Sequence, residues 1–407
     1  MIEKIWTGTL PNGLRVVHVP ATSKVGFCGV AVGAGSRDEV CGKYGLAHFV
    51  EHTIFKGTLK RRSWHILNRM ESVGGEINAY TTKEETVVYS VFPAEHLQRA
   101  AELIADLVQN SQFPEAELDK ERDVVLEEAN SYLDSPADAV YDDFEDLAWK
   151  NSALGHNILG TQADLLTISG NDCRQHLFAL FAPRNMVFFA LGPMTTSTVI
   201  RTAERYFGSM NNALMRQQRV APAPVQPFHI ARNIDSHQAH TIYGAPIFSM
   251  HDERKYALSL LNNLLGGPGM NSLLNVAIRE RRGYAYSVES SLAMLSDCGL
   301  ITIYFGSDVR NVNHCLRIIA NTIDKLANKP MSTRALDAAK KQFIGQLQLA
   351  DDIHETQALT AAKSCLHFGH IDPADVVEEH IKAVSAADIM DMASIITPNN
   401  ASTLSLH

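Results

Sequence analysis

The sequence lacks the signals of a secreted or membrane-spanning protein. Its six cysteines are scattered over 407 residues without any Cys-x-x-Cys spacing, so a disulfide framework is not expected. No apolar run is long enough to cross a membrane, and the first residues do not form a signal peptide. We therefore expect buried thiols, no membrane partner and, most simply, a cytoplasmic location.

Positive charge is also scarce. The chain has 36 Lys and Arg against 45 Asp and Glu, and its net charge of −9 argues against a nucleic-acid partner. The glycine-rich segment 266–269 is not followed by Gly-Lys-Ser/Thr, which excludes a P-loop there. The length and the 45% hydrophobic content are those of a globular protein with room for two domains.

The most informative feature that is present is the run His-Phe-Val-Glu-His at residues 48–52. On a helix His48 and His52 share one face, and Glu51 lies beside them. Two imidazoles could hold one zinc ion while Glu51 reaches a water on it, in the inverse of the His-Glu-x-x-His order. Gly45 and Gly57 bracket this helix. The pattern indicates a hydrolytic zinc centre.

A catalytic zinc usually has three protein ligands, so a third one is needed. The segment 114–132 starts with Pro, carries acids in its first turns and has no internal breaker, which predicts a helix. Glu121 and Glu128 fall on its apolar stripe, whose other members are Leu118, Val125, Ala129 and Tyr132. A carboxylate on a buried stripe is costly unless it is paired or metal-bound. Either glutamate could be the third ligand, because the periodicity does not choose between them.

The order of predicted elements repeats on either side of residues 208–230, which have the Pro-rich and polar composition of a linker. We predict two homologous domains, 1–215 and 225–407. The repeated pairs are strand 85–92 with helix 96–110, and strand 300–305 with helix 312–326. Because strands occur in runs joined by short turns, the predicted class is α+β with mostly antiparallel sheets packed with helices.

Three segments resemble the pitrilysin/insulinase-type (M16, inverzincin) zinc metallopeptidases, in the branch of mitochondrial processing peptidase and its bacterial relatives. They are residues 48–58, 74–82 and 121–128. The resemblance implies two homologous domains that face each other as a clam shell around a cleft. It also implies one zinc ion per chain on His48, His52 and Glu128, with Glu121 as the acid that supports the ligands.

The resemblance extends to residues that hold the substrate. Arg279 and Tyr286 match a family pair that reaches from the second domain across the cleft toward the zinc, and both are catalytic candidates. Asn78 and Ala79 match positions where an extended peptide adds to a sheet edge through its main chain. The implied reaction is hydrolysis of peptide bonds in short or unfolded peptides, with Glu51 as general base.

Two other functions are compatible with these residues. The chain could be a zinc-binding subunit that needs a partner chain for activity, or a non-proteolytic assembly subunit, although every position of the zinc motif is filled. A homodimer is a possible assembly. The remaining histidines show no ligand spacing and are interpreted as surface or strand residues, among them His65, His156, His237 and His240.

Overall fold

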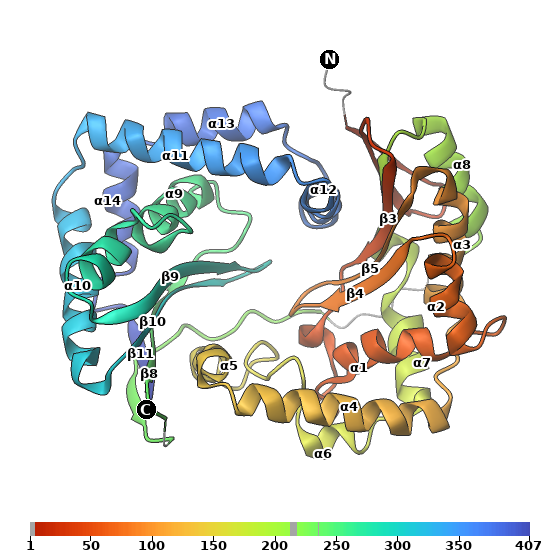
Figure 1. Cartoon of the computed structure of the whole chain (residues 1–407), viewed down its shortest axis with the longest axis horizontal. Coiled ribbons are helices and arrows are strands. Elements are labelled where there is room, and N and C mark those ends of the chain that lie inside the picture. The colour runs from red at the N-terminus through yellow and green to blue at the C-terminus, as the bar shows by residue number, and fades with distance from the viewer. Residues whose placement is uncertain (1–4, 212–217, 235) are drawn as a thin grey trace. The chain divides into compact units, whose positions relative to one another are not determined.

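The computed structural model describes residues 5–211, 218–234 and 236–407. Residues 212–217, inside the predicted linker, lie outside the described residues. The chain divides into two compact units, each built on one sheet packed with helices (Figure 1), which confirms the α+β class. Unit 1 comprises Met1–Ala129, His156–Val220 and Ala350–Ile371, and unit 2 comprises Asn130–Gly155, Ala221–Leu349 and Asp372–His407.

The sheet of unit 1 has six strands in the order β1-β2-β6-β3-β5-β4. All neighbours are antiparallel except the parallel pair β2 and β6. Every residue of β6 is buried, as expected for a strand covered on both faces. The strands are β1 (Trp6–Thr9), β2 (Arg15–Pro20), β3 (Val25–Val32), β4 (Glu76–Thr81), β5 (Thr86–Pro93) and β6 (Met186–Gly192).

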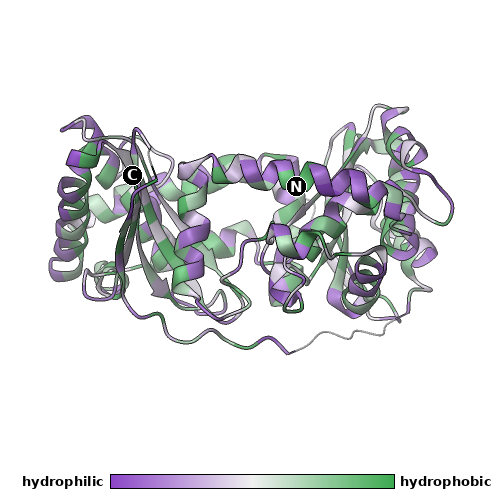
Figure 2. Cartoon of the chain, turned by 90° about the horizontal axis from the view of Figure 1, so that it is seen from below, coloured by the Kyte–Doolittle hydropathy of each residue, from purple (hydrophilic) through white to green (hydrophobic). Residues whose placement is uncertain are grey.

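One face of this sheet packs against helices from the first half of the chain. The core there joins strand residues such as Val30 and Phe188 to Leu103 and Phe207 on the helices. The helices of this half are α1 (Leu46–Thr53), α2 (Ser63–Glu71), α3 (Leu97–Asn110), α4 (Glu115–Leu133), α5 (Pro136–Ala148), α6 (Gln162–Leu165), α7 (Gly170–Leu180) and α8 (Thr196–Phe207). Figure 2 shows hydrophobic and hydrophilic residues mixed along these helices, as amphipathic packing requires.

The sheet of unit 2 repeats this topology with five strands in the order β7-β11-β8-β10-β9. Its single parallel pair, β7 with β11, corresponds to β2 with β6. The predicted duplication is therefore visible in the strand order itself. The strands are β7 (His229–Arg232), β8 (Ala239–Ile247), β9 (Ala285–Met294), β10 (Gly299–Ser307) and β11 (Ser402–Leu406). The helices are α9 (Lys255–Gly266), α10 (Val312–Asn328), α11 (Thr333–Asp351), α12 (His354–Phe368), α13 (Ala374–Ala383) and α14 (Ala386–Ile395).

The two halves of the chain exchange one helix each. Helix α12, from the second half, covers the other face of the unit 1 sheet and buries Ala358 and Ala362 against Phe189 and its neighbours. Helix α5, from the first half, packs Phe144 against Ile242 in unit 2. The compact units differ from the predicted domains 1–215 and 225–407, because each unit includes a helix from the other half of the sequence.

The cysteines form no disulfide, and all six lie in the described part of the chain. The expectation of buried thiols is confirmed for Cys28, Cys173, Cys315 and Cys365. Cys41 is a loop thiol, exposed before α1, and Cys298 is only partly buried. In the part of the chain that the structure describes, no helix combines the length and apolarity needed to cross a membrane.

Polar contacts also anchor α12 to the unit 1 sheet. The buried carboxylate of Glu85 accepts hydrogen bonds from Lys363 and His367, both at 2.7 Å. Burial alone would raise the pKa of Glu85. The bonds from His367 and Lys363 outweigh it and hold this pKa below its usual value. A carboxyl group whose pKa is lower in the folded state stabilises the protein above the unfolded-state pKa, and this stabilisation is lost on acidification.

We predict that Glu85→Gln lowers the free energy of unfolding by about 1–3 kcal/mol at pH 7, because Lys363 and His367 lose a charged acceptor. The difference from the unsubstituted protein should shrink as the pH falls below about 4, where the unfolded carboxyl is protonated. Urea denaturation at pH 7 and below about pH 4 measures this difference in the free energy of unfolding. Glu95→Gln, at an exposed site, is the control. A deficit that is equally large at low pH would contradict the role of charge.

Candidate metal centre

The start of α1 is fixed by a buried carboxylate. Glu39 accepts hydrogen bonds from the backbone N–H groups of Gly45 at 3.0 Å and Ala47 at 2.7 Å. A negative group at this end satisfies unpaired donors and matches the helix dipole. Gly45 has φ 90°, and a Cβ there would lie 2.5 Å from the carbonyl oxygen of Leu159. Only glycine therefore fits the turn that leads into the His-x-x-Glu-His helix.

His156 supports this cap from a distant loop. Its Nε2 donates to Glu39 Oε2 at 2.9 Å, and its ring stacks on Tyr44 with 4.0 Å between centroids. The interpretation of His156 as a surface or strand residue is wrong, because its side chain is only 10% exposed. Burial raises the pKa of Glu39, while the hydrogen bonds from His156 and the backbone oppose that shift. The sequence contains no local signal for this pairing, since 117 positions separate the partners.

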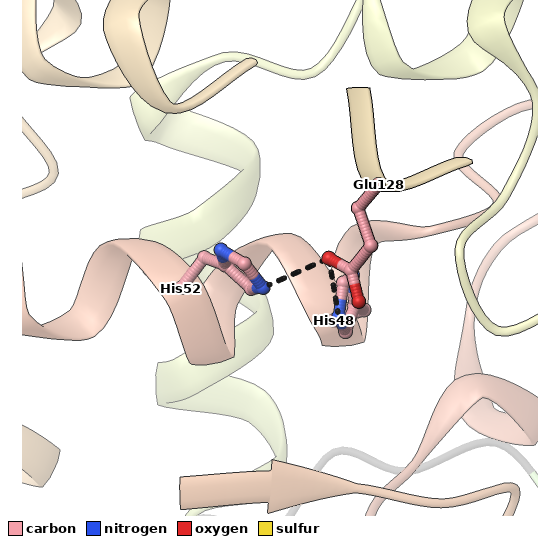
Figure 3. Close-up of side chains that lie close together, drawn as sticks. All are labelled: His48, His52 and Glu128. Carbon is pink, nitrogen blue, oxygen red and sulfur yellow. Dashed lines mark ion pairs between the residues drawn. The ribbon is translucent and has the colours of Figure 1, made fainter. Parts of the chain in front are cut away.

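His48 and His52 lie on one face of α1, as predicted. Leu46, Phe49 and Val50 are buried in the core of unit 1, and the ring atoms of His48 and His52 face a carboxylate on α4. His48 Nε2 lies 3.7 Å and His52 Nε2 lies 3.4 Å from Glu128 Oε2 (Figure 3). The three donor atoms all lie within 4.8 Å of one another. Two imidazoles and a carboxylate thus converge on a common point without bonding closely to each other.

Helix α4 spans Glu115–Leu133, close to the predicted 114–132. Its buried stripe contains Leu118, Glu121 and Val125, as the periodicity indicated, and Glu127 is exposed. Tyr132 was placed on the same stripe, but it is exposed, because the helix leaves unit 1 after Ala129 and no longer packs on its core. Between the two glutamates, the structure places Glu128 beside both imidazoles and Glu121 one layer behind them.

Glu121 ties the two helices together. Its Oε1 lies 3.1 Å from His52 Nδ1, so this nitrogen carries the proton and donates it to the carboxylate. That tautomer leaves the lone pair of His52 on Nε2, the atom that faces Glu128. The other oxygen, Oε2, pairs with Lys56 Nζ at 2.6 Å. Sequence reasoning missed Lys56, although it follows His52 by four residues and so continues the same helical stripe.

The electrostatics suit metal binding and proton transfer. Burial, together with the nearby His52, lowers the pKa of His48 to about 4, so its imidazole is neutral at physiological pH. Neutral imidazole is the form that coordinates a metal. Burial also raises the pKa of Glu51, while Thr81 on β4 and His52 oppose this shift. A carboxylate whose pKa moves toward neutrality becomes a better proton acceptor.

The residues matched to substrate binding are divided between the two units. Asn78 and Ala79 belong to β4, the last strand of the unit 1 sheet, where they pair with Tyr89 and Val88 of β5. An edge strand has backbone groups available for another strand. Arg279 and Tyr286 belong to unit 2.

Arg279 and Tyr286 are neighbours. Arg279 lies in the π-helical turn η5 (Asn275–Glu280), a local geometry that is common at functional sites. Its Cζ is 5.6 Å from the ring centre of Tyr286 on β9, and both side chains line a cavity of about 870 Å³ in unit 2. Tyr286 is 81% exposed, so most of its ring is open to solvent. The structure thus brings this pair together within unit 2.

Comparisons with known proteins agree with this arrangement. Residues 15–162 match the family model described as Insulinase (Peptidase family M16), and residues 167–343 match Peptidase M16 inactive domain. The chain resembles an uncharacterized zinc protease of Bacillus subtilis, with 32% identity over 95% of this chain and 94% of the relative. A similar protein of Rickettsia bellii, also named an uncharacterized zinc protease, is 32% identical over 99% of this chain and 97% of the relative.

Solved structures show the same fold. A protease from Helicobacter pylori superposes with a TM-score of 0.90 at 22% identity and covers 100% of both chains. A peptidase M16 inactive domain from Pseudomonas fluorescens superposes with a TM-score of 0.91 at 16% identity, covering 99% of this chain and 98% of that one. The matches to both family models and the two bacterial relatives together show that the chain belongs to the insulinase (M16) peptidase family.

Proposed function

We propose that this protein is a zinc-dependent endopeptidase that hydrolyses short or unfolded peptides. The observation that carries the proposal is the convergence of His48, His52 and Glu128 on one point, with Glu51 on the same helix as the two histidines. The family and the zinc proteases among its relatives support a peptidase of this metal.

The donor set fits zinc in both chemistry and spacing. Zinc bonds of about 2.0–2.2 Å at tetrahedral angles separate ligand atoms by roughly 3.3–3.6 Å. The distances from Glu128 Oε2 to the two imidazole nitrogens, 3.4 and 3.7 Å, are close to that range. Two imidazoles and one carboxylate form a known catalytic ligand set that leaves one position open. When bound, zinc would polarise the substrate carbonyl and lower the pKa of a water molecule to roughly 7.

The other side chains of this site have separate roles in proton transfer, in orienting the ligands and in binding the substrate. Glu51 accepts the proton of the attacking water and passes it to the leaving amine, a role that its raised pKa favours. Glu121 holds His52 in the tautomer that presents Nε2, and Lys56 keeps Glu121 in place. Tyr286 donates a hydrogen bond to the oxyanion that develops on the substrate, and Arg279 positions the peptide.

Substrate selection follows from main-chain pairing. We propose that an extended peptide adds to the free edge of β4 beside Asn78 and Ala79. Such pairing requires a segment without secondary structure of its own and reads the side chains only weakly. This restricts the substrate to short or unfolded peptides more than to one sequence.

A second possibility is that the chain binds zinc but needs a partner subunit for hydrolysis. The match of residues 167–343 to the family model named Peptidase M16 inactive domain supports this second possibility. Against it, one polypeptide here carries both the donor cluster and the Arg279/Tyr286 pair. We also propose a cytoplasmic location and a homodimer. Size-exclusion chromatography with light scattering measures the oligomeric state.

The central test uses the purified chain alone with a quenched peptide library and metal analysis. We predict about one zinc per chain and hydrolysis that a chelator abolishes and added zinc restores. Glu51→Gln should retain the metal and lose about 10²–10⁴-fold in kcat/KM, because the general base is gone. Normal turnover by Glu51→Gln would refute the mechanism, and zinc binding without hydrolysis by the unsubstituted chain would favour the partner-dependent subunit.

The adjacent glutamates of α4 provide a matched pair for the metal ligand. We predict that Glu128→Gln weakens zinc binding by more than the roughly 10–100-fold that loss of a supporting residue costs. Glu127→Gln removes the same charge from the exposed side of the helix and should leave the zinc affinity unchanged. Competition with a zinc-sensitive dye measures both. A greater loss in Glu127→Gln would mean that Glu128 is not the ligand.

Tyr286 can be tested without disturbing the fold, since its ring is largely exposed. We predict that Tyr286→Phe lowers kcat by about 10²–10³-fold through loss of one oxyanion donor. Zinc content and thermal stability should stay unchanged. If only KM rises while kcat is preserved, Tyr286 binds the ground state and the transition state equally well and does not stabilise the oxyanion specifically.

A further inference from the structure

Unit 1 contains a second cavity, between α2 and the start of α3, that no step of the proposed peptidase mechanism uses. Its volume is about 320 Å³. Every side chain that lines it presents nitrogen donors, and none is a carboxylate. The lining residues are Lys60, Arg61, His65, Asn68, Arg69 and Arg99. In a chain with a net charge of −9, such a concentration of cations requires an explanation.

Two carboxylates on α3 hold part of this cluster in place. Arg61 donates to both oxygens of Glu102 at 2.8 Å and to Asp106 at 2.6 Å. Asp106 is buried and also accepts from Thr58 Oγ1 at 2.8 Å. Arg69 Nη2 lies 3.2 Å from Glu102. These bonds hold the guanidinium groups of Arg61 and Arg69 at the cavity, so this part of the cationic lining is preorganised.

The carboxylates do not neutralise the cluster. Four cationic side chains line the cavity, and two carboxylates, Glu102 and Asp106, pair with them, which leaves a formal excess of two positive charges. Lys60 Nζ approaches Asp106 only to 4.0 Å. Among the described residues no carboxylate lies within ion-pair distance of Arg99, so its charge belongs to this excess.

Arg99 is held against another cation. Its Nε donates to the backbone carbonyl of Arg69, and its Nη2 donates to Ser72 Oγ at 3.0 Å. Partial burial and the charge of Arg69 lower the pKa of Arg99. The charge of Arg69 thus acts on Arg99, and an anion bound near both cations would replace this repulsion with attraction.

From this geometry we infer that the cavity binds a phosphate group. Arginine forks match the oxygen geometry of phosphate, and lysine adds a point charge. The volume admits one phosphate group together with part of the molecule that carries it. The exposed side chains of Leu59, Trp64 and Leu67 lie next in sequence to the lining residues, and Trp64 packs edge-on against His65. The phosphate could therefore come from free solution or from a lipid headgroup.

The test titrates inorganic phosphate into the zinc-loaded protein at low ionic strength and measures binding by calorimetry. Binding should weaken about tenfold or more in Arg99→Gln and in Lys60→Gln, because each loses a charge-assisted contact. Lys60 is 63% exposed, so its substitution does not endanger folding. Arg334→Gln removes a charge from an exposed site in unit 2 and should bind phosphate normally.

A parallel arm measures cosedimentation with phosphatidylglycerol vesicles, with phosphatidylcholine vesicles as the reference. Association with phosphatidylglycerol that Arg99→Gln abolishes would assign the phosphate to a lipid, and binding of phosphate alone would assign it to a free ligand. Absence of binding in both arms overturns the inference. An equal loss in Arg334→Gln also overturns it, since that would reflect net charge. None of these measurements depends on peptide hydrolysis, so they stand apart from the proposed function.

Discussion

The site depends on one buried carboxylate, that of Glu121. It accepts a hydrogen bond from His52 on α1 and pairs with Lys56 one turn later, while its own helix, α4, carries Glu128. Glu121 thereby fixes α1 and α4, which are about 70 residues apart in sequence, against each other. If Glu121 were lost, Lys56 and His52 would both lack their acceptor, and Glu128 would lose its position relative to the imidazoles. The convergence of the three donors is therefore a consequence of this second layer of contacts.

The exchange of α5 and α12 places a constraint on the whole chain. Each sheet contributes to two hydrophobic clusters, and a helix from the other half of the sequence packs into one of the two. The apolar face formed by Val17, Val187 and Phe189 would be exposed to water without α12. Neither half of the sequence completes its own core, so the duplicated halves are bound to fold as one chain. The buried Glu85, with partners on α12, makes the same connection through charge.

The sequence predicts those features that depend on local periodicity. The two faces of α1, the buried phase of Glu121 and the exposure of Glu127 all follow from 3.6 residues per turn, and the structure agrees. Contacts between distant segments could not be predicted. His156 reaches Glu39 across 117 positions, and α12 joins a sheet whose strands end before residue 193. Tyr132 shows where periodicity fails. It lies on the buried stripe of α4, but this end of the helix extends beyond the core of unit 1, so the side chain is exposed.

The two similar halves differ in their potential metal ligands: among the described residues, the one group of three His, Cys, Asp or Glu side chains close enough to hold a metal lies in the first half. Helix α9 follows β8 as α1 follows β3, so the two helices occupy equivalent places in the topology. Where α1 carries His48, Glu51 and His52, α9 has the apolar and amide sequence Lys-Tyr-Ala-Leu-Ser-Leu-Leu-Asn-Asn-Leu-Leu-Gly. Its Gly266 instead lets the helix end approach β9, since a Cβ there would lie 2.7 Å from the backbone nitrogen of Ser290. The equivalent helix therefore lines the cavity that Arg279 and Tyr286 also line, and it carries none of the three side chains that α1 contributes to the candidate metal site.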